Sequence, residues 1–194
     1  MSLKELHEFW FDDIQVTEDY YRTQVPRWFF GKDVAFDREC GRRFVSWTKF
    51  YDAVPGATPQ AHLAKIILFD QIPRNAFRGS AKAHLFDHKA RALALHALGT
   101  SFESSLGLPE RLFLYMPLQH AEDLTLQDLS VDSFERMHHE APAAIHNWTA
   151  LALVKAQAHR ETIRRFGRFP QRNLKLGRVN SREEWEFLRT ATQS

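Results

Sequence analysis

The sequence predicts an all-α fold in a single domain over residues 1–194. Apolar residues recur at spacings of three and four along almost the whole chain, which is the period of an amphipathic helix. No run of β-branched residues alternates with polar ones between hairpin turns, so we expect no strands. Pro, Gly and capping residues divide the pattern into several helices. Helices joined by short turns pack as antiparallel hairpins, which is the arrangement we expect here.

The first two expected helices lie on either side of a tryptophan-rich connection. The apolar period predicts a helix over about residues 3–11 and a second over about residues 33–54. Residues 25–29 form the connection between them. Pro55 and Gly56 end the second helix, because both residues interrupt a helical pattern.

The next two helices have clear capping signals. Thr58 caps a helix over residues 58–71, with Pro59 at the first helical position, where a missing N–H costs nothing. Pro73 ends this helix, because proline disfavours helical geometry in the residue before it. A serine then starts a helix over residues 80–99, and its final glycine suits a left-handed terminator.

The second half of the chain is also helical by the same period. We expect helices over residues 109–117, 118–128, 131–139 and 142–166. The last helix has the clearest start in the chain, because Ser181 and Glu184 are spaced as a capping box. It covers about three turns.

Composition limits the class of protein. Hydrophobic residues make up 44% of the chain and charged residues 26%, which is the balance of a packed globular domain. Cys40 is the only cysteine, so no intramolecular disulfide and no cysteine metal cluster can form. The N-terminus lacks the apolar run of a signal peptide, and no stretch reaches the ~20 apolar residues of a membrane span. We therefore expect a cytoplasmic protein without a membrane partner.

Charge is distributed unevenly along the chain. Residues 155–178 carry eight cations and one acid, so this segment has a net charge of +7 while the rest has −5. Such a division indicates internal acid–base docking or a local anion site more than a surface that coats nucleic acid. The expected partner is an anionic small molecule or an acidic peptide, and a homo-oligomer is compatible with the sequence.

The first candidate site residue is Asp70, which shares the apolar face of its helix with Leu63, Ile66 and Ile67. An anion near a helix C-terminus is unfavourable by ~0.3–1 kcal/mol, and burial adds to the cost unless a cation pairs with it. Arg74 and Arg78 follow Asp70 closely in the sequence. Asp70 is therefore either a structural clamp, which is the favoured interpretation, or the acid partner of an anion-binding arginine cluster.

The second motif places His120, Glu122 and Asp123 within one turn, at what the sequence predicts to be a helix start. Acids in a first helical turn are favoured by the helix dipole, so capping explains Glu122 and Asp123. A functional site explains them equally well, because clustered titratable groups are typical of such sites.

The third motif is basic and runs from His159 to Asn173. His159 follows the apolar stripe of the long helix and is expected to point inward, where histidines more often have a structural role. Arg164, Arg168 and Arg172 are harder to attribute to packing, because a planar guanidinium binds carboxylate or phosphate through two parallel hydrogen bonds. A ligand site and an internal salt-bridge network both fit these arginines.

Several kinds of chemistry lack their sequence signatures. Neither H-E-x-x-H nor a paired E-x-x-H set is present, so we expect no metal, and a mixed site of His120, Glu122, Asp123 and His159 is the weaker alternative. No Gly-rich phosphate loop or G-x-S-x-G turn occurs, and Cys40 has no catalytic partner. We expect no cofactor.

The chain resembles an uncharacterised bacterial family called domain of unknown function 924. The segments that carry the resemblance are two Trp–Phe pairs at 10–11 and 28–29 and the runs at 70–79, 115–123 and 159–178. The resemblance covers nearly the whole chain and implies an all-helical fold similar to tetratricopeptide-like hairpin arrays, with no established activity. Gln119, Ala121 and Gln171 depart from the family pattern of glutamate, serine and histidine. The missing glutamate weakens a metal site most.

The favoured functional hypothesis is a helical-hairpin binding module with an arginine-rich site for an anionic peptide or small anionic ligand. Its candidate ligand-binding residues are Arg74, Asn75, Arg78, His120, His159, Arg164, Arg168 and Arg172. The alternative is a hydrolase or transferase that acts on a phosphorylated or acyl substrate, with His120 as general acid or base supported by Asp70 or Glu122. Nucleic-acid binding by the basic segment is a third hypothesis, which the acidic remainder of the chain disfavours.

Overall fold

The computed structural model describes residues 2–29, Gly31 and residues 33–191, and this part of the chain is all helical, without strands. Its α-helices are α1 (Leu3–Phe11), α2 (Glu18–Trp28), α3 (Val34–Phe44), α4 (Pro59–Ala76), α5 (Asp87–Leu98), α6 (Leu108–Gln119), α7 (Leu124–Glu140), α8 (His146–Phe166) and α9 (Arg182–Ala191). Short 3₁₀ helices are η1 (Val45–Lys49), η2 (Ala81–His84), η3 (Glu103–Ser105), η4 (Ala143–Ile145) and η5 (Pro170–Arg172). The predicted all-α fold class is confirmed. No helix among the described residues is long and apolar enough to cross a bilayer.

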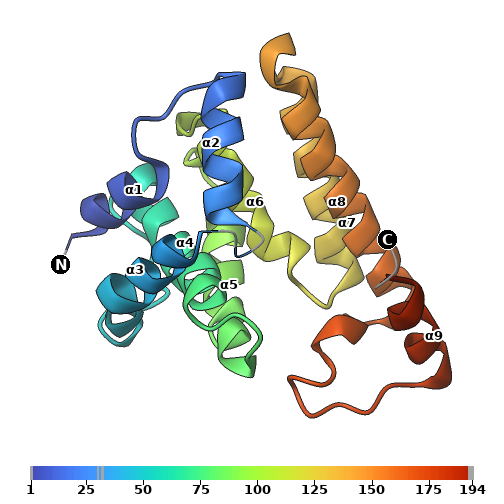
Figure 1. The fold of residues 1–194 in the computed structure, drawn as a ribbon. Coiled ribbons are helices and arrows are strands. Elements are labelled where there is room, and N and C mark those ends of the chain that lie inside the picture. Colours follow the sequence, from blue (N-terminus) through green and yellow to red (C-terminus); the bar gives the residue numbers. More distant parts are fainter. Residues whose placement is uncertain (1, 30, 32, 192–194) are drawn as a thin grey trace.

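Neighbouring helices pack as hairpins, and α4 lies at the centre of the first group. α4 contacts α1, α3, α5 and α6, whereas α7 packs along α8 and against α6. Figure 1 shows α1 to α6 gathered on one side, with α7 and α8 side by side on the other and α9 beneath them. This agrees with the expected antiparallel hairpins, and a tetratricopeptide-like arrangement stays a prediction.

The bounds of α1 and the capped starts of α4 and α9 agree with the sequence predictions. α1 has the predicted bounds, and Thr58 caps α4 by accepting a hydrogen bond from the backbone N–H of Ala61 at 3.2 Å. In the capping box of α9, Glu184 N–H donates to Ser181 Oγ at 3.2 Å, and Ser181 N–H donates to Glu184 Oε2 at 2.7 Å. These signals are reliable because they depend only on residues close together in sequence.

The prediction of a non-helical connection around residues 25–29 was wrong. Thr17 caps α2, which continues to Trp28 with Pro26 inside its last turn. Tyr21, Gln24 and Trp28 are buried at helical spacing. The polar residues between them hide this stripe from the sequence pattern, and burial of the aromatic rings outweighs the cost of the proline.

The other differences concern where helices begin and end. The expected helix over 33–54 is α3 followed by η1, and the expected helix over 80–99 is η2 followed by α5. Gly99 has a φ of −82°, so it is not the left-handed terminator that its position predicted. The expected helices over 118–128 and 131–139 are replaced by α7, and α8 begins at His146 after η4.

Prolines did not end α4 or α6 where the sequence predicted. α4 continues through Pro73 to Ala76, and α6 continues through Pro117 to Gln119. A helical proline loses one backbone hydrogen bond, which is unfavourable in an isolated helix. Packing of α4 against four other helices compensates for this loss, since nearly every side chain from His62 to Pro73 is buried. α4 therefore carries Asp70 into the centre of the molecule.

Candidate functional site

Asp70 is fully buried on α4 and has three side-chain partners. Its Oδ1 lies 3.0 Å from Arg74 Nη1 and 2.8 Å from His120 Nδ1, and its Oδ2 accepts a hydrogen bond from Gln71 Nε2. Burial by itself raises the pKa of Asp70, but the positive neighbours lower it below the ordinary value. Asp70 is thus an ionised anchor that joins the first motif to the second.

His120 follows the last residue of α6, and not a helix start as the sequence predicted. Burial and the nearby Arg74 lower the pKa of His120, against the opposing effect of Asp70. The ring is therefore neutral near pH 7. Because ionised Asp70 can only accept, His120 Nδ1 carries the proton, and Nε2 has a lone pair that accepts no hydrogen bond from the described residues.

A second carboxylate, Asp87 at the start of α5, extends this network. Asp87 accepts two hydrogen bonds from Arg74, at 2.8 and 3.0 Å. Arg172 Nη1 donates to the backbone oxygen of His120 at 3.0 Å and lies 3.7 Å from Asp87 Oδ2. The segment that begins at Asp70, the His120 turn and the C-terminal basic segment therefore meet in the folded chain.

Glu122 and Asp123 have different roles. Glu122 accepts hydrogen bonds from Arg178 at 2.7 and 2.9 Å and from the backbone N–H of Phe169 at 2.8 Å. Asp123 caps α7 by accepting from the backbone N–H of Leu126 at 3.0 Å. Glu122 thus holds the C-terminal segment onto the turn after α6, and it does not contact His120 through any hydrogen bond within the described residues.

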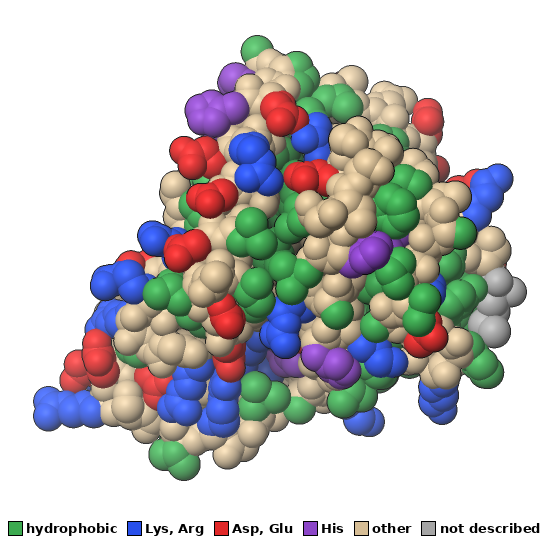
Figure 2. All heavy atoms as spheres, turned by 180° about the vertical axis from the view of Figure 1, so that it is seen from behind, with side chains coloured by type: hydrophobic (Ala, Val, Ile, Leu, Met, Phe, Trp, Pro, Cys, Tyr) green, Lys and Arg blue, Asp and Glu red, His purple; other side chains and the backbone are tan. Residues whose placement is uncertain are grey.

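Four predicted ligand-binding residues make their hydrogen bonds outside the Asp70 network. These pairs are Asn75 with the backbone oxygen of Trp28, Arg78 with Asp37, Arg164 with Glu161 and Arg168 with Glu184. Arg164 and its partner are both largely exposed, whereas Arg78 and Arg168 are partly buried. On the back of the molecule, acidic and basic side chains lie next to one another at the surface (Figure 2).

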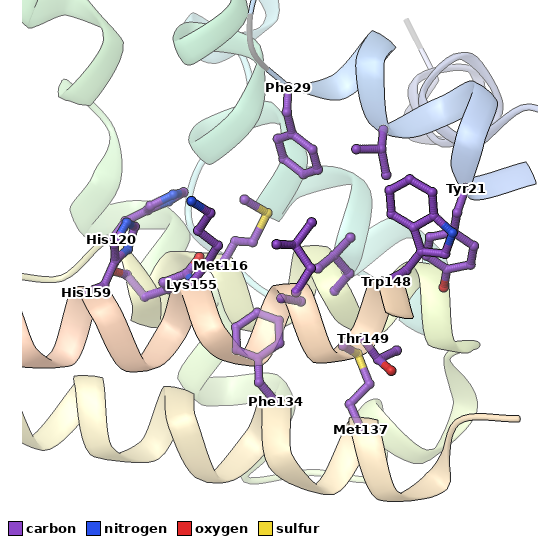
Figure 3. A pocket seen from close by; sticks show the side chains of 15 residues that line it. Tyr21, Phe29, Met116, His120, Phe134, Met137, Trp148, Thr149, Lys155 and His159 are labelled. Carbon is purple, nitrogen blue, oxygen red and sulfur yellow. The ribbon is translucent and has the colours of Figure 1, made fainter. Parts of the chain in front are cut away.

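A cavity of about 310 Å³ lies between α2, α6, α7 and α8. Aliphatic, aromatic and thioether side chains form most of its wall, including Phe29, Met116, Phe134 and Met137. In Figure 3, Trp148 and Tyr21 lie at one end, and His120, His159 and Lys155 lie at the other. The cavity is therefore amphipathic along its length.

His159 contributes from α8 to the polar end of the cavity. Its Nδ1 lies 3.2 Å from the backbone oxygen of Gln119, and its ring packs edge-on against Phe169 with centroids 5.2 Å apart. Burial, with a smaller contribution from His120, lowers the pKa of His159 to about 4. No cluster of His, Cys, Asp or Glu suited to a metal ion occurs in the described part of the chain.

Sequence reasoning missed much of the cavity wall. Tyr21 and Val25 belong to α2, which was not predicted, so their shared face could not be recognised. Lys155 stands out only as a cation within the apolar pattern of α8. Asp87 had no signal, because the helix expected over residues 80–99 placed it in the helix interior, whereas α5 begins at this residue. Recognising α2 as a helix was the one step that could have found more of the site.

Comparison with known families identifies the chain. A model described as a bacterial protein of unknown function, DUF924, matches residues 6–192. The chain belongs to this family. The structure of an Agrobacterium tumefaciens protein of unknown function, ATU0120, is similar to this DUF924 chain, with 26% identity, a TM-score of 0.64 and 96% of each chain covered. No curated protein matches the chain. The resemblance expected from the motifs is thus confirmed at the level of the family.

Proposed function

We propose that this DUF924 protein is a binding module for a small molecule that has an apolar body and an acidic end group. The observation that carries the proposal is the cavity, whose wall is mostly apolar and whose titratable groups His120, His159 and Lys155 gather at one end. Its volume of about 310 Å³ lies at the small end of the range typical of ligand sites. This volume fits a small molecule, so we favour the small anionic ligand over the acidic peptide.

The anion-binding part of this proposal differs from the arginine cluster that the sequence suggested. Arg78, Arg164 and Arg168 are each paired with a carboxylate through two hydrogen bonds. Paired guanidinium groups have little attraction left for a ligand. The remaining attraction for an acid lies at the polar end of the cavity, where Lys155 is exposed and Arg172 lies behind His120.

Binding can be tested with a ligand series on the intact protein. We expect sodium octanoate and 4-phenylbutyrate to raise the melting temperature, because a ligand that binds only the folded state stabilises it by mass action. Acetate, which has no apolar body, is expected to have no effect at the same concentration.

A variant that fills the cavity provides the control. Ala152 lines the cavity from α8, and Ala152→Phe is expected to abolish the stabilisation by octanoate. Ala158→Phe, on an exposed position of the same helix, is the matched variant and should leave the effect intact. If octanoate and 4-phenylbutyrate both fail to stabilise the wild type, or if the two variants behave alike, the cavity is not the site.

A second function is favoured by the contact between Asp70 and His120. A buried carboxylate that holds histidine Nδ1 at 2.8 Å, with the ring at a cavity wall, is an arrangement that supports general-base catalysis. In this version His120 Nε2 takes a proton from water as the water oxygen attacks an acyl carbon bound in the cavity. The proton then passes to the departing alcohol.

This hydrolase is tested with a panel of p-nitrophenyl esters of increasing acyl length. We expect hydrolysis above the buffer rate for chains that fit the cavity, and its loss in His120→Gln. The rate should rise with pH through a pKa below that of an ordinary histidine, because burial and Arg74 lower it. Equal rates for wild type and His120→Gln would leave binding as the function.

A further inference from the structure

Three of the candidate arginines hold a carboxylate through the edge formed by Nε and Nη2, whereas Arg74 holds Asp87 through Nη1 and Nη2. The hydrogen bonds are 2.5 and 2.9 Å from Arg78 to Asp37, 2.7 and 2.6 Å from Arg164 to Glu161, and 2.6 and 2.8 Å from Arg168 to Glu184. This side-on fork matches the two oxygens of a carboxylate. In each of these arginines, the edge that binds a carboxylate through two hydrogen bonds is therefore already occupied.

Arg172 differs from these arginines because the same edge is open. Its Nη1 donates to the backbone oxygen of His120 at 3.0 Å, and the nearest carboxylate oxygen, Asp87 Oδ2, lies 3.7 Å from that Nη1. Within the part of the chain that the structure describes, Nε and Nη2 of Arg172 make no hydrogen bond. Arg172 is thus held in place by one nitrogen while two donors remain available.

The surroundings of Arg172 make the open edge costly. Its side chain is only 15% exposed, and its guanidinium lies over the Phe169 ring at 4.4 Å. Burial, together with repulsion from Arg74, lowers the pKa of Arg172 to about 10. Asp87, Glu122 and Asp70 offset part of this effect. A carboxylate at the open edge would offset more of it, because part of the desolvation has already been incurred in the folded protein.

Arg172 is also next to the polar end of the cavity. The Phe169 ring that supports it packs on His159, with centroids 5.2 Å apart, and His159 lines the cavity. His120 connects the two as well, since its backbone oxygen binds Arg172 while its ring forms part of the cavity wall. Arg172 itself does not line the cavity, so the acid group must extend beyond these two histidines to reach its guanidinium.

We infer that the Nε and Nη2 edge of Arg172 binds the carboxylate of an acid whose apolar body occupies the cavity. This inference rests on the proposed function and deepens it, since it names the ligand class as a carboxylic acid and the residue that selects it. A phosphate monoester has the same bidentate chemistry, so the two acids must be compared directly.

The experiment measures the affinity of octanoate, octyl phosphate and 1-octanol for wild type, Arg172→Met and Arg172→Lys by calorimetry. We expect Arg172→Met to weaken octanoate by about tenfold or more, which is the value of a charged bidentate contact, without changing the affinity for 1-octanol. Arg172→Lys should keep part of the preference for acids, because it keeps the charge but not the fork. Arg164→Met, on an exposed and internally paired arginine, is the matched control and should bind like wild type.

A measurement on the unaltered protein covers the case in which Arg172 variants fail to fold. The ¹⁵N–¹H resonance of Arg172 Nε should move on titration with octanoate and stay unchanged with 1-octanol. Preference for octyl phosphate over octanoate overturns the carboxylate assignment. Octanoate binding that is equal in wild type and Arg172→Met, or an Arg172 resonance that does not move, overturns the inference as a whole.

These outcomes separate the inference from the proposed function. If Ala152→Phe removes octanoate binding while Arg172→Met does not, the cavity is the site and Arg172 is not the acid receptor. If Arg172→Met removes binding while Ala152→Phe does not, Arg172 binds acids but the cavity is not involved. If octanoate does not bind the wild type at all, both fail.

Discussion

A buried carboxylate is stable at Asp70 only because three side chains from two elements surround it. Arg74 and Gln71 come from the same helix, whereas His120 comes from the end of α6. Without these partners, the desolvation cost of the charge would keep it out of the core. Asp70 therefore fixes the orientation of the His120 ring as well as the packing of α4 on α6.

Replacing Asp70 tests this account. We expect Asp70→Asn to lower the free energy of unfolding by about 3 kcal/mol, because it removes one of the two carboxylates that pair with buried Arg74. Urea denaturation gives the value. Asp132→Asn, at an exposed position on α7, should change stability by less than about 0.5 kcal/mol. Equal small effects at both positions would mean that the Asp70 network adds little to stability.

His159 predicts a dependence of stability on pH. The pKa of an ordinary histidine is 6.5, and that of folded His159 is about 4. As pH falls from about 6.5 to about 4, the unfolded chain binds a proton that the folded chain does not, so stability decreases over this range. We expect His159→Gln to reduce that decrease by on the order of 2 kcal/mol, measured by urea denaturation at several pH values.

His88 supplies the comparison for this pH series. It is exposed on α5, so His88→Gln should follow the wild-type curve. A His159→Gln curve that also coincides with wild type between pH 4 and 6.5 would show that His159 is protonated as readily in the folded protein as in the unfolded chain.

At the scale of elements, α9 combines a capping box with limited packing against the rest of the molecule. It packs mainly on η5, and Phe187 contacts Phe166 of α8 with ring centroids 5.1 Å apart. Besides the capping box, Glu184 pairs with Arg168 and Glu183 pairs with Arg165 of α8. Loss of a cap should therefore appear locally, as opening of this helix.

We expect Ser181→Ala to destabilise α9 by about 1 kcal/mol, the usual value of a lost N-cap. A loss of about 1 kcal/mol makes opening of α9 about fivefold more frequent, so hydrogen exchange of its amides should become about fivefold faster. Exchange in α4 should stay unchanged. Ser101→Ala, at an exposed turn position, is the control. Uniform acceleration across the molecule would mean that α9 does not open as a separate unit.

At the scale of the whole molecule, the basic segment is docked by acids from elsewhere in the chain. The C-terminal arm, residues 167–180, is held at one point by Glu122 and at another by Glu184 of α9. Internal acid–base docking and a local anion site were the two explanations of the uneven charge along the sequence. Most of the basic segment pairs internally, which leaves Arg172 as the arginine with an open edge among those considered.

Removing the Glu122 contact should release this arm. Glu122→Gln weakens the hydrogen bonds to Arg178 and to the backbone N–H of Phe169, so we expect faster tryptic cleavage within residues 167–180. The measurement is the rate of cleavage followed by mass spectrometry. Glu135→Gln, at an exposed position on α7, should be cleaved like wild type. Unchanged cleavage in Glu122→Gln would mean that other contacts hold the arm.

Much of the fold followed from the sequence, because helical period and capping act over a few residues. The start of α4 at Thr58 and the capping box at Ser181 were predictable for this reason. Proline positions misled the prediction at Pro73 and Pro117, since the packing that compensates for a lost hydrogen bond comes from other helices. The helix around Tyr21 was missed because polar residues lie between the aromatic residues of its buried face.

The sequence by itself determined the all-α class, the family and the residues in which polar chemistry is concentrated. Only the tertiary structure decided that Asp70 binds His120, that Glu122 binds Arg178, and that Arg172 alone among the five candidate arginines leaves its carboxylate-binding edge unpaired within the described residues. The physical reason is that hydrogen bonds and ion pairs such as these join residues about 50 positions apart. The sequence gives the numbers of acidic and basic residues, but the packing of the helices determines which of them form pairs.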